Sequence, residues 1–417
     1  MTSTSFDLPR SSRPGARRAP THSLPTAARA VLGMLPGLKQ GVLELHLPDG
    51  SRTSFGEGGL GACLRITDWH AFKRILGSGD IGFAEGYIAG EWDTPDLTAL
   101  LNLFIANRDE LQRAVYGTWW GSLLYRVKHA LNRNSRSGSA KNIHAHYDLG
   151  NAFYALWLDP SMSYSSAWFE GDPTRGLAAA QHAKVRRALE QAGVASGSRV
   201  LEIGCGWGGL AESVARDFGA HVTGVTLSRE QLDWANRRVA AAGVGAHCDL
   251  RLQDYRDLGA EFEAQPFDAI VSIEMFEAVG REYWDSYFDM LRRCLKPGGR
   301  ACIQSITIRD DLFDRYVRST DFIQQYIFPG GLLPSVAQFE AQARRFGFQV
   351  ERRLEFGLDY AETLRRWRTD FLQRAPQVRE LGFDERFMRI WKFYLSYCEA
   401  AFMQRNTDVV QFTLRRD

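Results

Sequence analysis

The stretch Val200-Leu201-Glu202-Ile203-Gly204-Cys205-Gly206-Trp207-Gly208-Gly209 decides the fold of this 417-residue chain. A short apolar strand, Arg199 to Ile203, runs into alternating glycines, and a helical pattern follows. Glycines at such a turn let the backbone bend sharply and approach a ligand without Cβ clashes. The spacing is E-x-G-x-G-x-G, unlike the G-x-G-x-x-G of dinucleotide folds, and no P-loop lysine follows it. The loop therefore predicts a site for S-adenosylmethionine, with a plain strand-to-helix glycine turn as the alternative.

Strand and helix patterns alternate along the chain after this loop. Helical patterns cover residues 211–218, 229–242 and 282–295, and strand patterns cover residues 221–227, 249–253, 267–273, 300–308 and 408–414. This order predicts an α/β fold, a doubly wound and mostly parallel seven-stranded sheet with helices on both faces. An aromatic-rich insertion (309–344) and a helical stretch (360–403) interrupt the pattern. Insertions of this size are expected to form a helical lid on the substrate side of the crevice.

The N-terminal part of the chain has a different composition. Residues 1–28 are rich in Ser, Thr, Pro and Arg, and we predict a disordered lead-in there. Residues 29–133 are expected to form a small α+β domain that begins with a hairpin, Gly41 to Phe55, turning at Pro48-Asp49-Gly50. The polar segment 134–141 is predicted to be a linker, and residues 142–417 to be the domain with the glycine loop.

Composition narrows the classes of function. A net charge of +2 provides no general attraction to nucleic acid, so we expect no nucleic-acid partner. The six cysteines show no C-x-x-C spacing, which argues against a zinc site and a disulfide framework and favours a reducing cytoplasm. No apolar run reaches the roughly 18 to 20 residues that span a bilayer. We therefore expect a cytoplasmic chain without a metal.

Several polar residues follow the strands beyond the glycine loop. Thr226 and Gln231 lie where many methyltransferases place an acid that binds the ribose hydroxyls. Asp254 and Tyr255 follow the next strand and are expected to meet the adenine, with a turn cap as the alternative role of Asp254. These four residues extend the predicted cofactor site.

Further motifs make the chain from about residue 140 to the end resemble the cyclopropane-fatty-acyl-phospholipid synthase family. They include His146-Tyr147-Asp148-Leu149-Gly150-Asn151, Tyr164-Ser165-Ser166-Ala167, Leu252-Gln253-Asp254-Tyr255, Met275-Phe276-Glu277, Leu295-Lys296-Pro297-Gly298-Gly299, Tyr326-Ile327-Phe328-Pro329-Gly330 and Phe356-Gly357. The N-terminal segments Glu85-Gly86-Tyr87 and Gly90-Glu91-Trp92 also resemble the extra domain of members that act on phospholipid. The resemblance implies an S-adenosylmethionine-dependent methyltransferase that acts on the double bond of an unsaturated acyl chain.

The resemblance also implies roles for individual residues. Those expected at S-adenosylmethionine are Tyr164, Ser165, Glu202, Gly204, Cys205, Gly206, Gly208, Thr226, Gln231, Asp254 and Tyr255. In the family, a bicarbonate ion beside the sulfonium methyl is held by a Cys, a Glu, a His, a Tyr and the backbone of an Ile. Carried over in that order, these catalytic positions are Ser166, Glu277, Gln304, Tyr360 and Ile306, so the Cys and the His are replaced here. A family cysteine in the C-terminal helix matches Cys398, for which a small core residue is the alternative role.

Two products are compatible with this chemistry. Methyl transfer to an alkene leaves a carbocation, which aromatic faces stabilise; candidates are Phe322, Tyr326, Phe328, Trp367 and Phe371. Proton loss from the new methyl group closes a cyclopropane, whereas loss from a neighbouring carbon leaves a branched alkene. Gln304 cannot titrate as histidine does, so we hypothesise a methyl- or methylene-branched product as the alternative to cyclopropane. A methyltransferase for a soluble small molecule and a non-enzymatic lipid- or cofactor-binding protein are further alternatives.

The predicted substrate lies in a membrane, so the chain is expected to dock on its inner face as a peripheral protein. Between Leu111 and Lys141, six basic residues accompany Trp119, Trp120 and Tyr125, without an acidic residue. Interfacial helices combine these features, and a domain-packing helix with a solvated basic face is the alternative. The expected partners are unsaturated phospholipid acyl chains and the membrane surface. A homodimer is compatible with these expectations, although the sequence does not determine the oligomeric state.

Overall fold

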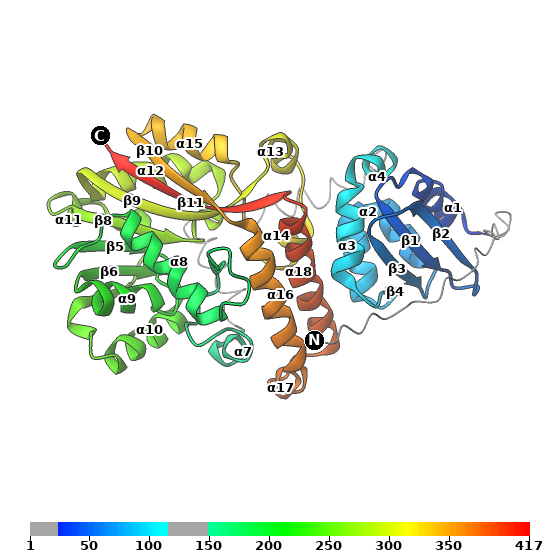
Figure 1. Ribbon diagram of the computed structural model, residues 1–417, viewed down its shortest axis with the longest axis horizontal. Coiled ribbons are helices and arrows are strands. Elements are labelled where there is room, and N and C mark those ends of the chain that lie inside the picture. Colours follow the sequence, from blue (N-terminus) through cyan, green and yellow to red (C-terminus); the bar gives the residue numbers. More distant parts are fainter. Residues whose placement is uncertain (1–23, 116–148) are drawn as a thin grey trace, which may run out of the picture.

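The computed structural model describes residues 24–115 and 149–417, which form two packed domains (Figure 1). The first begins with α1 (Thr26–Leu32), whose Ala28 and Val31 are buried, so the predicted disordered lead-in extends too far. Its four-stranded sheet has the order β2-β1-β3-β4. The predicted hairpin is confirmed, because β1 and β2 pair antiparallel. The bounds are β1 (Gly41–His46), β2 (Arg52–Glu57), β3 (Gly61–Ile66), β4 (Trp92–Asp93), α2 (His70–Ile88), α3 (Leu97–Ala106) and α4 (Arg108–Val115).

The second domain contains the predicted seven-stranded sheet, in the order β10-β11-β9-β8-β5-β6-β7. Strands β9, β8, β5, β6 and β7 pair in parallel, and β11 pairs antiparallel with both β9 and β10. The bounds are β5 (Arg199–Ile203), β6 (His221–Thr226), β7 (Cys248–Leu252), β8 (Phe267–Ile273), β9 (Leu295–Ile308), β10 (Phe348–Glu355) and β11 (Thr407–Arg416). Sequence reasoning missed β10, because this edge strand is mostly polar and exposed. The doubly wound α/β fold is confirmed.

Alternation along the central strands explains why helices cover both faces. Val200 packs in one apolar cluster with α8 and α9, whereas its neighbour Leu201 packs in another with α12 and α15. Successive strand residues point to opposite faces, so an apolar strand must be covered twice. The helix bounds are α8 (Leu177–Gln191), α9 (Gly209–Phe218), α10 (Arg229–Ala241), α11 (Gly259–Glu263), α12 (Trp284–Cys294) and α15 (Val336–Arg345).

The predicted lid helices lie between the two domains (Figure 1). They are α13 (Asp310–Val317), α14 (Phe322–Tyr326), α16 (Gly357–Gln373), α17 (Ala375–Glu380) and α18 (Glu385–Met403), and the short α7 (Asn151–Ala155) packs nearby. Arg389 Nε on α18 donates to the carbonyl oxygen of Tyr87 at 2.6 Å, and the Tyr326 hydroxyl donates to Glu85 Oε1 at 2.6 Å. One apolar cluster contains residues of both the N-terminal domain and the lid. The two domains therefore share a core.

Several predictions fall on residues 116–148, outside the described residues. These are most of the basic and aromatic segment that begins at Leu111, the linker 134–141 and the motif that begins at His146. Among the described helices, none is long and apolar enough to span a bilayer. Membrane docking and the homodimer stay predictions.

Candidate active site

A pocket of about 190 Å³ lies at the glycine loop, where the parallel strands β5, β6 and β8 end. Ligands of doubly wound sheets bind at this edge. Nine of the eleven residues predicted at S-adenosylmethionine line the pocket: Tyr164, Ser165, Glu202, Gly204, Cys205, Gly206, Thr226, Gln231 and Tyr255. The two that do not line it are Gly208 and Asp254.

The glycines of the loop have different tasks. Gly204 (φ +86°) and Gly206 (φ +48°) have left-handed backbones that favour glycine and bring the chain close to the pocket. A Cβ on Gly204 would lie 3.0 Å from Met275 Cγ. Gly208 instead precedes α9 as its left-handed cap, and a Cβ there would lie 2.8 Å from Ala235 Cβ on α10. Gly208 therefore serves helix packing.

Asp254 caps a turn, which is the alternative role that the sequence predicted for it. Its Oδ1 accepts the Arg256 N–H at 2.9 Å and caps the short helix Tyr255–Asp257. Its Oδ2 lies 2.5 Å from Arg256 Nη2. Gln253 and Arg256, which sequence reasoning did not select, line the pocket in its place.

The pocket suits S-adenosylmethionine. Glu202 lines it, and its Oε2 is buried without a hydrogen-bond partner among the described residues, so a ligand hydroxyl or amino group would supply the missing donor. Burial raises the pKa of Glu202 to about 8. Thr226 and Gln231, joined through Oγ1 and Oε1 at 3.2 Å, present further polar groups. Burial also raises the pKa of the Cys205 thiol, which stays neutral.

A second, larger cavity of about 530 Å³ opens beside this pocket. Its lining is mostly apolar and comes from the lid, from the end of β9 and from the N-terminal domain. The two cavities share Tyr164, Glu274 and Ala278. These three residues therefore mark the place where a bound cofactor and an apolar substrate would meet.

Glu274, just after β8, is the central residue of this junction, and sequence reasoning missed it. Its Oε1 accepts the Ser166 backbone N–H at 2.8 Å and Gln304 Nε2 at 2.8 Å. Its Oε2 accepts the Tyr360 hydroxyl at 2.7 Å. The residue has a left-handed backbone (φ +49°), which is uncommon outside glycine and typical of functional positions. A carboxylate one residue before the quoted Met275-Phe276-Glu277 motif was the available signal.

Two partners of Glu274 show how the replaced positions work. The Ser166 hydroxyl donates to the carbonyl oxygen of Ala167 at 2.9 Å, so only its backbone N–H serves the site. Gln304 Oε1 accepts Gln411 Nε2 at 2.9 Å, and this bond orients the amide so that Nε2 faces Glu274. Both Ser166 and Gln304 are fully buried. The Gln304 amide is a neutral hydrogen-bond donor, whereas a histidine at this position could carry a positive charge.

Only one carboxylate oxygen of Glu277 has hydrogen-bond partners among the described residues. Its Oε1 accepts the backbone N–H of Ile306 and the Ser305 hydroxyl, the latter at 3.2 Å. Its Oε2 is buried without a hydrogen-bond partner among the described residues. Burial, together with the nearby charge of Glu274, raises the pKa of Glu277 to about 8. Two adjacent carboxyl groups cannot easily ionise together, so Glu277 holds the proton at neutral pH. The expectation that Tyr360 and Glu277 orient one ion is wrong in detail, because Tyr360 bonds to Glu274.

Most of the residues expected to hold bicarbonate have another partner. Three of the five positions expected to hold it, those of Ser166, Gln304 and Tyr360, bind the Glu274 carboxylate instead. The ionised Glu274 carboxylate resembles bicarbonate in shape and charge, and it accepts hydrogen bonds from the residues that were expected to hold the ion. The residues do not fit bicarbonate, and the expectation of this second cofactor is not supported by the structure.

Lys184 on α8 adds a buried positive charge. Its Nζ donates to Ser165 Oγ at 2.6 Å. Burial lowers the pKa of Lys184 to about 8, and the attraction to Glu274 is the main influence that opposes this and favours the charged amine. Burial raises the pKa of Glu274, and the charge of Lys184 is the main influence that lowers it. Lys184 therefore favours the ionised form of Glu274.

Only some of the lid residues that were predicted at the substrate site line the larger cavity. Cys398 lines the larger cavity, and burial raises the pKa of its thiol well above the usual value, so it is a neutral wall residue. Of the five aromatic candidates, only Phe328 lines the cavity. Helix α18 contributes four aromatic residues to the lining that were not among these candidates: Phe393, Tyr394, Tyr397 and Phe402. Tyr360 stacks on Phe402 with ring centroids 4.5 Å apart.

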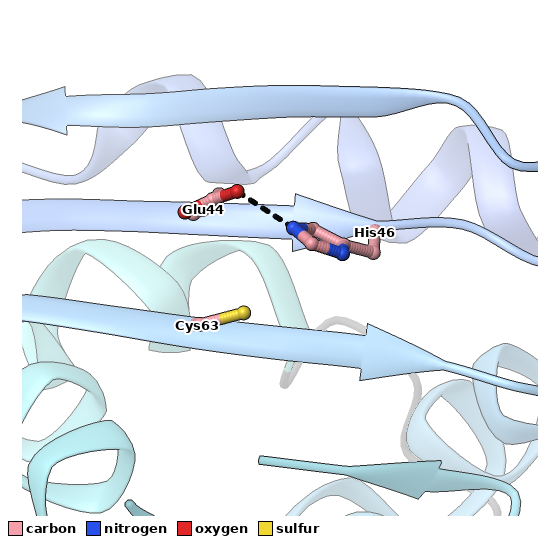
Figure 2. Close-up of side chains that lie close together, drawn as sticks. All are labelled: Glu44, His46 and Cys63. Atoms are coloured by element: carbon pink, nitrogen blue, oxygen red, sulfur yellow. Dashed lines mark hydrogen bonds and ion pairs between the residues drawn. The ribbon is translucent and has the colours of Figure 1, made fainter. Parts of the chain in front are cut away.

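Metal-ligand residue types also gather elsewhere, on the sheet of the N-terminal domain (Figure 2). Glu44, His46 and Cys63 have ligand atoms within 4.8 Å of one another, and His46 Nε2 lies 2.6 Å from Glu44 Oε1. Arg52 and Arg65 flank His46 in register on the two neighbouring strands, and their charges oppose a cation. The cluster is a hydrogen-bonded pair beside a thiol. The expectation of no metal stays a prediction.

Comparisons with known proteins agree with this geometry. The family model described as mycolic acid cyclopropane synthetase matches residues 134–412. A tuberculostearic acid methyltransferase of Mycobacterium tuberculosis is 40% identical over 97% of this chain and 95% of its own length. The cyclopropane-fatty-acyl-phospholipid synthase of Escherichia coli is 36% identical over 86% of this chain and 89% of its own length. A crystal structure of a mycolic acid cyclopropane synthase complexed with SAH and CTAB aligns with a TM-score of 0.61 and 32% identity, covering 66% of this chain and 98% of that one.

Fold, cofactor pocket and sequence relatives lead to the same assignment. The glycine loop sits at the carboxyl ends of parallel strands, and the adjoining apolar cavity is lined by Glu277 and Tyr360, two of the positions that the resemblance implies. The matched region covers the catalytic domain as far as Phe412, within its last strand β11. The chain belongs to the mycolic acid cyclopropane synthetase family of S-adenosylmethionine-dependent methyltransferases.

Proposed function

We propose that this enzyme methylates the double bond of an unsaturated phospholipid acyl chain, and that Glu274 is its built-in general base. The single observation that carries the proposal is the junction of the two cavities at Glu274. The large apolar cavity suits an acyl chain and disfavours a small polar substrate. The phospholipid synthase among the relatives supports the same class of substrate.

When bound, S-adenosylmethionine would supply an electrophilic methyl group. The π electrons of the alkene would form the new carbon–carbon bond as the methyl–sulfur bond breaks, which leaves S-adenosylhomocysteine and a carbocation on the acyl chain. Aromatic side chains of the cavity, such as Phe328, Tyr394 and Phe402, stabilise this cation without reacting with it. Glu274 then accepts a proton from the cation, and the electrons of the broken C–H bond form the new bond. Loss of a proton from the chain gives a methyl-branched alkene. A 1,2-hydride shift that moves the cation to the methyl-bearing carbon, followed by proton loss from the methyl group, gives a methylene branch. Three hydrogen-bond donors orient Glu274 for this step and favour its ionised form against burial, which raises its pKa.

We further propose that the product is a methyl- or methylene-branched acyl chain. Two observations support this choice over cyclopropane. The tuberculostearic acid methyltransferase is similar over nearly the full length and at the higher identity. The anion site of cyclopropane-forming relatives, as the resemblance implies it, is replaced here by a carboxylate fixed to the backbone after β8.

Deuterium labelling tests the product. Purified enzyme would receive a monounsaturated phospholipid and S-adenosylmethionine with a trideuteriomethyl group. A methyl-branched alkene retains all three deuterons, whereas a cyclopropane and a methylene branch each retain two. Proton NMR of unlabelled product separates the last two, because a methylene branch gives olefinic signals and cyclopropane gives high-field methylene signals. High-field signals as the main product would contradict the branched assignment.

The role of Glu274 is tested by two substitutions. We expect Glu274→Gln, which keeps the shape but cannot accept the proton, to lower kcat at least about 100-fold. Glu274→Gly opens room for a free anion, so added bicarbonate should restore part of its activity but leave wild type unchanged. Glu282→Gln, an exposed glutamate before α12, is the matched control and should behave as wild type. Bicarbonate-dependent turnover by wild type would refute a built-in base.

We propose that the enzyme reaches its substrate as a peripheral protein on the inner face of the membrane. The basic and aromatic composition of residues 111–141 supports this prediction. Liposome flotation tests it: we expect binding to vesicles with anionic lipid that weakens as salt is raised. Equal absence of binding at low and high salt would count against it.

A further inference from the structure

The larger cavity extends well beyond the reaction site, into the N-terminal domain. On the catalytic side, its walls include Ile306, Phe328 and Tyr360. In the N-terminal domain, its walls are the buried apolar side chains of Leu43, Leu45, Leu64, Ile66, Phe72 and the partly buried Phe104. The cavity therefore has apolar walls in both domains.

Charged residues line the same cavity where the two parts meet. Asp80 on α2 and Arg108 at the start of α4 come from the N-terminal domain, and Arg315 on α13 and Asp321 before α14 come from the lid. Loss of surrounding water in the cavity wall raises the pKa of Asp80, although the residue keeps an exposed surface, and the charges of Arg108 and Arg315 both lower it. The charge of Asp80 in turn helps to raise the pKa of Asp321. The four side chains therefore form one group, here called the polar belt.

The backbone brings the polar belt into an otherwise apolar cavity. Gly79 (φ 58°, ψ −126°) breaks α2 into two segments, and the break places Ser78, Gly79 and Asp80 in the cavity wall. Only glycine adopts such a conformation readily, and unusual backbone conformations are concentrated at functional sites. The carboxylates already have backbone partners. Asp321 accepts the Gln324 N–H at 2.9 Å as a helix cap, and Asp80 accepts the N–H of Ile81.

The two arginines are the groups of the polar belt that suit an anionic ligand. Guanidinium groups bind phosphate through paired N–H donors. A ligand with a phosphate between two long apolar chains matches a cavity with arginines between two apolar parts. We propose that Arg108 and Arg315 bind the phosphate of a diacyl phospholipid, whose reactive chain runs to Glu274 and whose second chain lies in the N-terminal domain. This inference rests on the proposed function and adds the site of the headgroup.

A comparison of two substrates tests the proposal. The enzyme would be assayed in nonionic detergent micelles with a monounsaturated phosphatidylglycerol and with the diacylglycerol of the same acyl chains, which lacks the phosphate. For Arg108→Gln and Arg315→Gln we expect KM for the phospholipid to rise at least about tenfold, with KM for the diacylglycerol unchanged. The exposed Arg386→Gln on α18 is the matched control and should change neither value.

Each result decides the question. Equal losses on both substrates, or no loss on the phospholipid, would overturn the phosphate site. Calorimetric titration with S-adenosylmethionine shows whether each variant is folded, and Arg→Lys at the same positions provides a milder change. Inorganic phosphate that inhibits diacylglycerol turnover in wild type but not in Arg108→Gln would indicate a site for free phosphate and overturn the lipid assignment. If wild type methylates neither lipid, the proposed function itself fails.

Discussion

Glu274 and Glu277 stand three residues apart, and their surroundings separate their roles. Glu274 accepts hydrogen bonds from a backbone N–H, an amide and a phenol, all of which favour the ionised carboxylate. Glu277 keeps one oxygen buried without a partner among the described residues. A pair of carboxyl groups divided in this way provides one base and one neutral neighbour.

Lys184 is expected to set the pH at which Glu274 becomes a base. Its positive charge lowers the pKa of Glu274, so Lys184→Met should raise that pKa. The base works only when ionised, and activity is lost as pH falls through its pKa. The acid limb of the kcat/KM profile of Lys184→Met should therefore move to higher pH by about one unit or more. Arg186→Met, which removes an exposed charge from the same helix, is the control. An unshifted acid limb with lowered kcat would reduce Lys184 to a structural role.

Glu277 is expected to make stability depend on pH. Its pKa is raised from 4.5 to about 8 in the folded chain, so the folded state binds its proton more tightly than the unfolded state. The stabilisation is complete below pH 4.5 and is lost as pH rises towards 8. The stability of Glu277→Gln relative to wild type should therefore increase by at least about 1 kcal/mol between about pH 5 and about pH 8. Urea unfolding of both proteins at several pH values measures this difference, and Glu282→Gln should show no trend.

The residues of the active site lie where strands of the large sheet end. The glycine loop after β5, the turn after β6 and Glu274 after β8 all lie at one edge because the three strands are parallel. The end of β9 adds Gln304 and Ile306, and β11, paired antiparallel with β9, places Gln411 beside Gln304. The sheet order thus assembles one site from residues more than 200 positions apart in the chain (Tyr164 to Gln411).

The glycine loop is expected to tolerate no side chain at Gly204. A methyl group there would lie 3.0 Å from Met275 in a left-handed backbone, on the wall of the cofactor pocket. Gly204→Ala should weaken S-adenosylmethionine binding at least about tenfold in calorimetric titration. Gly243→Ala carries the same backbone cost (φ +71°) in open space, so it should bind like wild type. Equal loss in both variants would assign the effect to backbone strain alone.

At the scale of the whole molecule, the lid joins the two domains. Arg389 on α18 donates to the carbonyl oxygens of Tyr87 and Trp92, at 2.6 and 3.2 Å, and its guanidinium lies 4.0 Å from the Tyr87 ring centroid. Thr98 donates to Glu399 Oε2 at 3.2 Å across the same boundary. The large cavity draws its walls from both sides of this boundary, so the substrate site depends on it.

Loss of the Arg389 contacts is expected to loosen this boundary. Arg389→Met keeps the apolar stem but removes two hydrogen bonds and a cation–π contact, which should lower the free energy of unfolding by about 1 to 3 kcal/mol. Because the domains share a core, wild type should unfold in one transition, and calorimetry of the variant should show a lower Tm. Arg386→Met, one turn earlier on α18 and exposed, should leave Tm unchanged. Two separate transitions in wild type would contradict the shared core.

The sequence by itself determined the sheet and most of the cofactor pocket, because both depend on local patterns. Strands such as Phe267–Ile273 and the glycine loop after Ile203 are read from apolar runs and backbone freedom, which act over a few residues. The polar edge strand β10 and the packing role of Gly208 have no such local signal. The short capping bonds that occupy Asp254 were foreseen only as an alternative.

Only the tertiary structure decided what replaces the anion of the active site. Ser166 and Gln304 in the sequence indicated that two expected groups were lost, but not that Glu274 receives the hydrogen bonds of those that remain. That outcome depends on a left-handed backbone at Glu274 and on distances among β8, β9, α16 and the segment around Ser166. The meeting of two domains in one cavity likewise follows from long-range packing. Such contacts arise between residues far apart in the chain, where no spacing or periodicity records them.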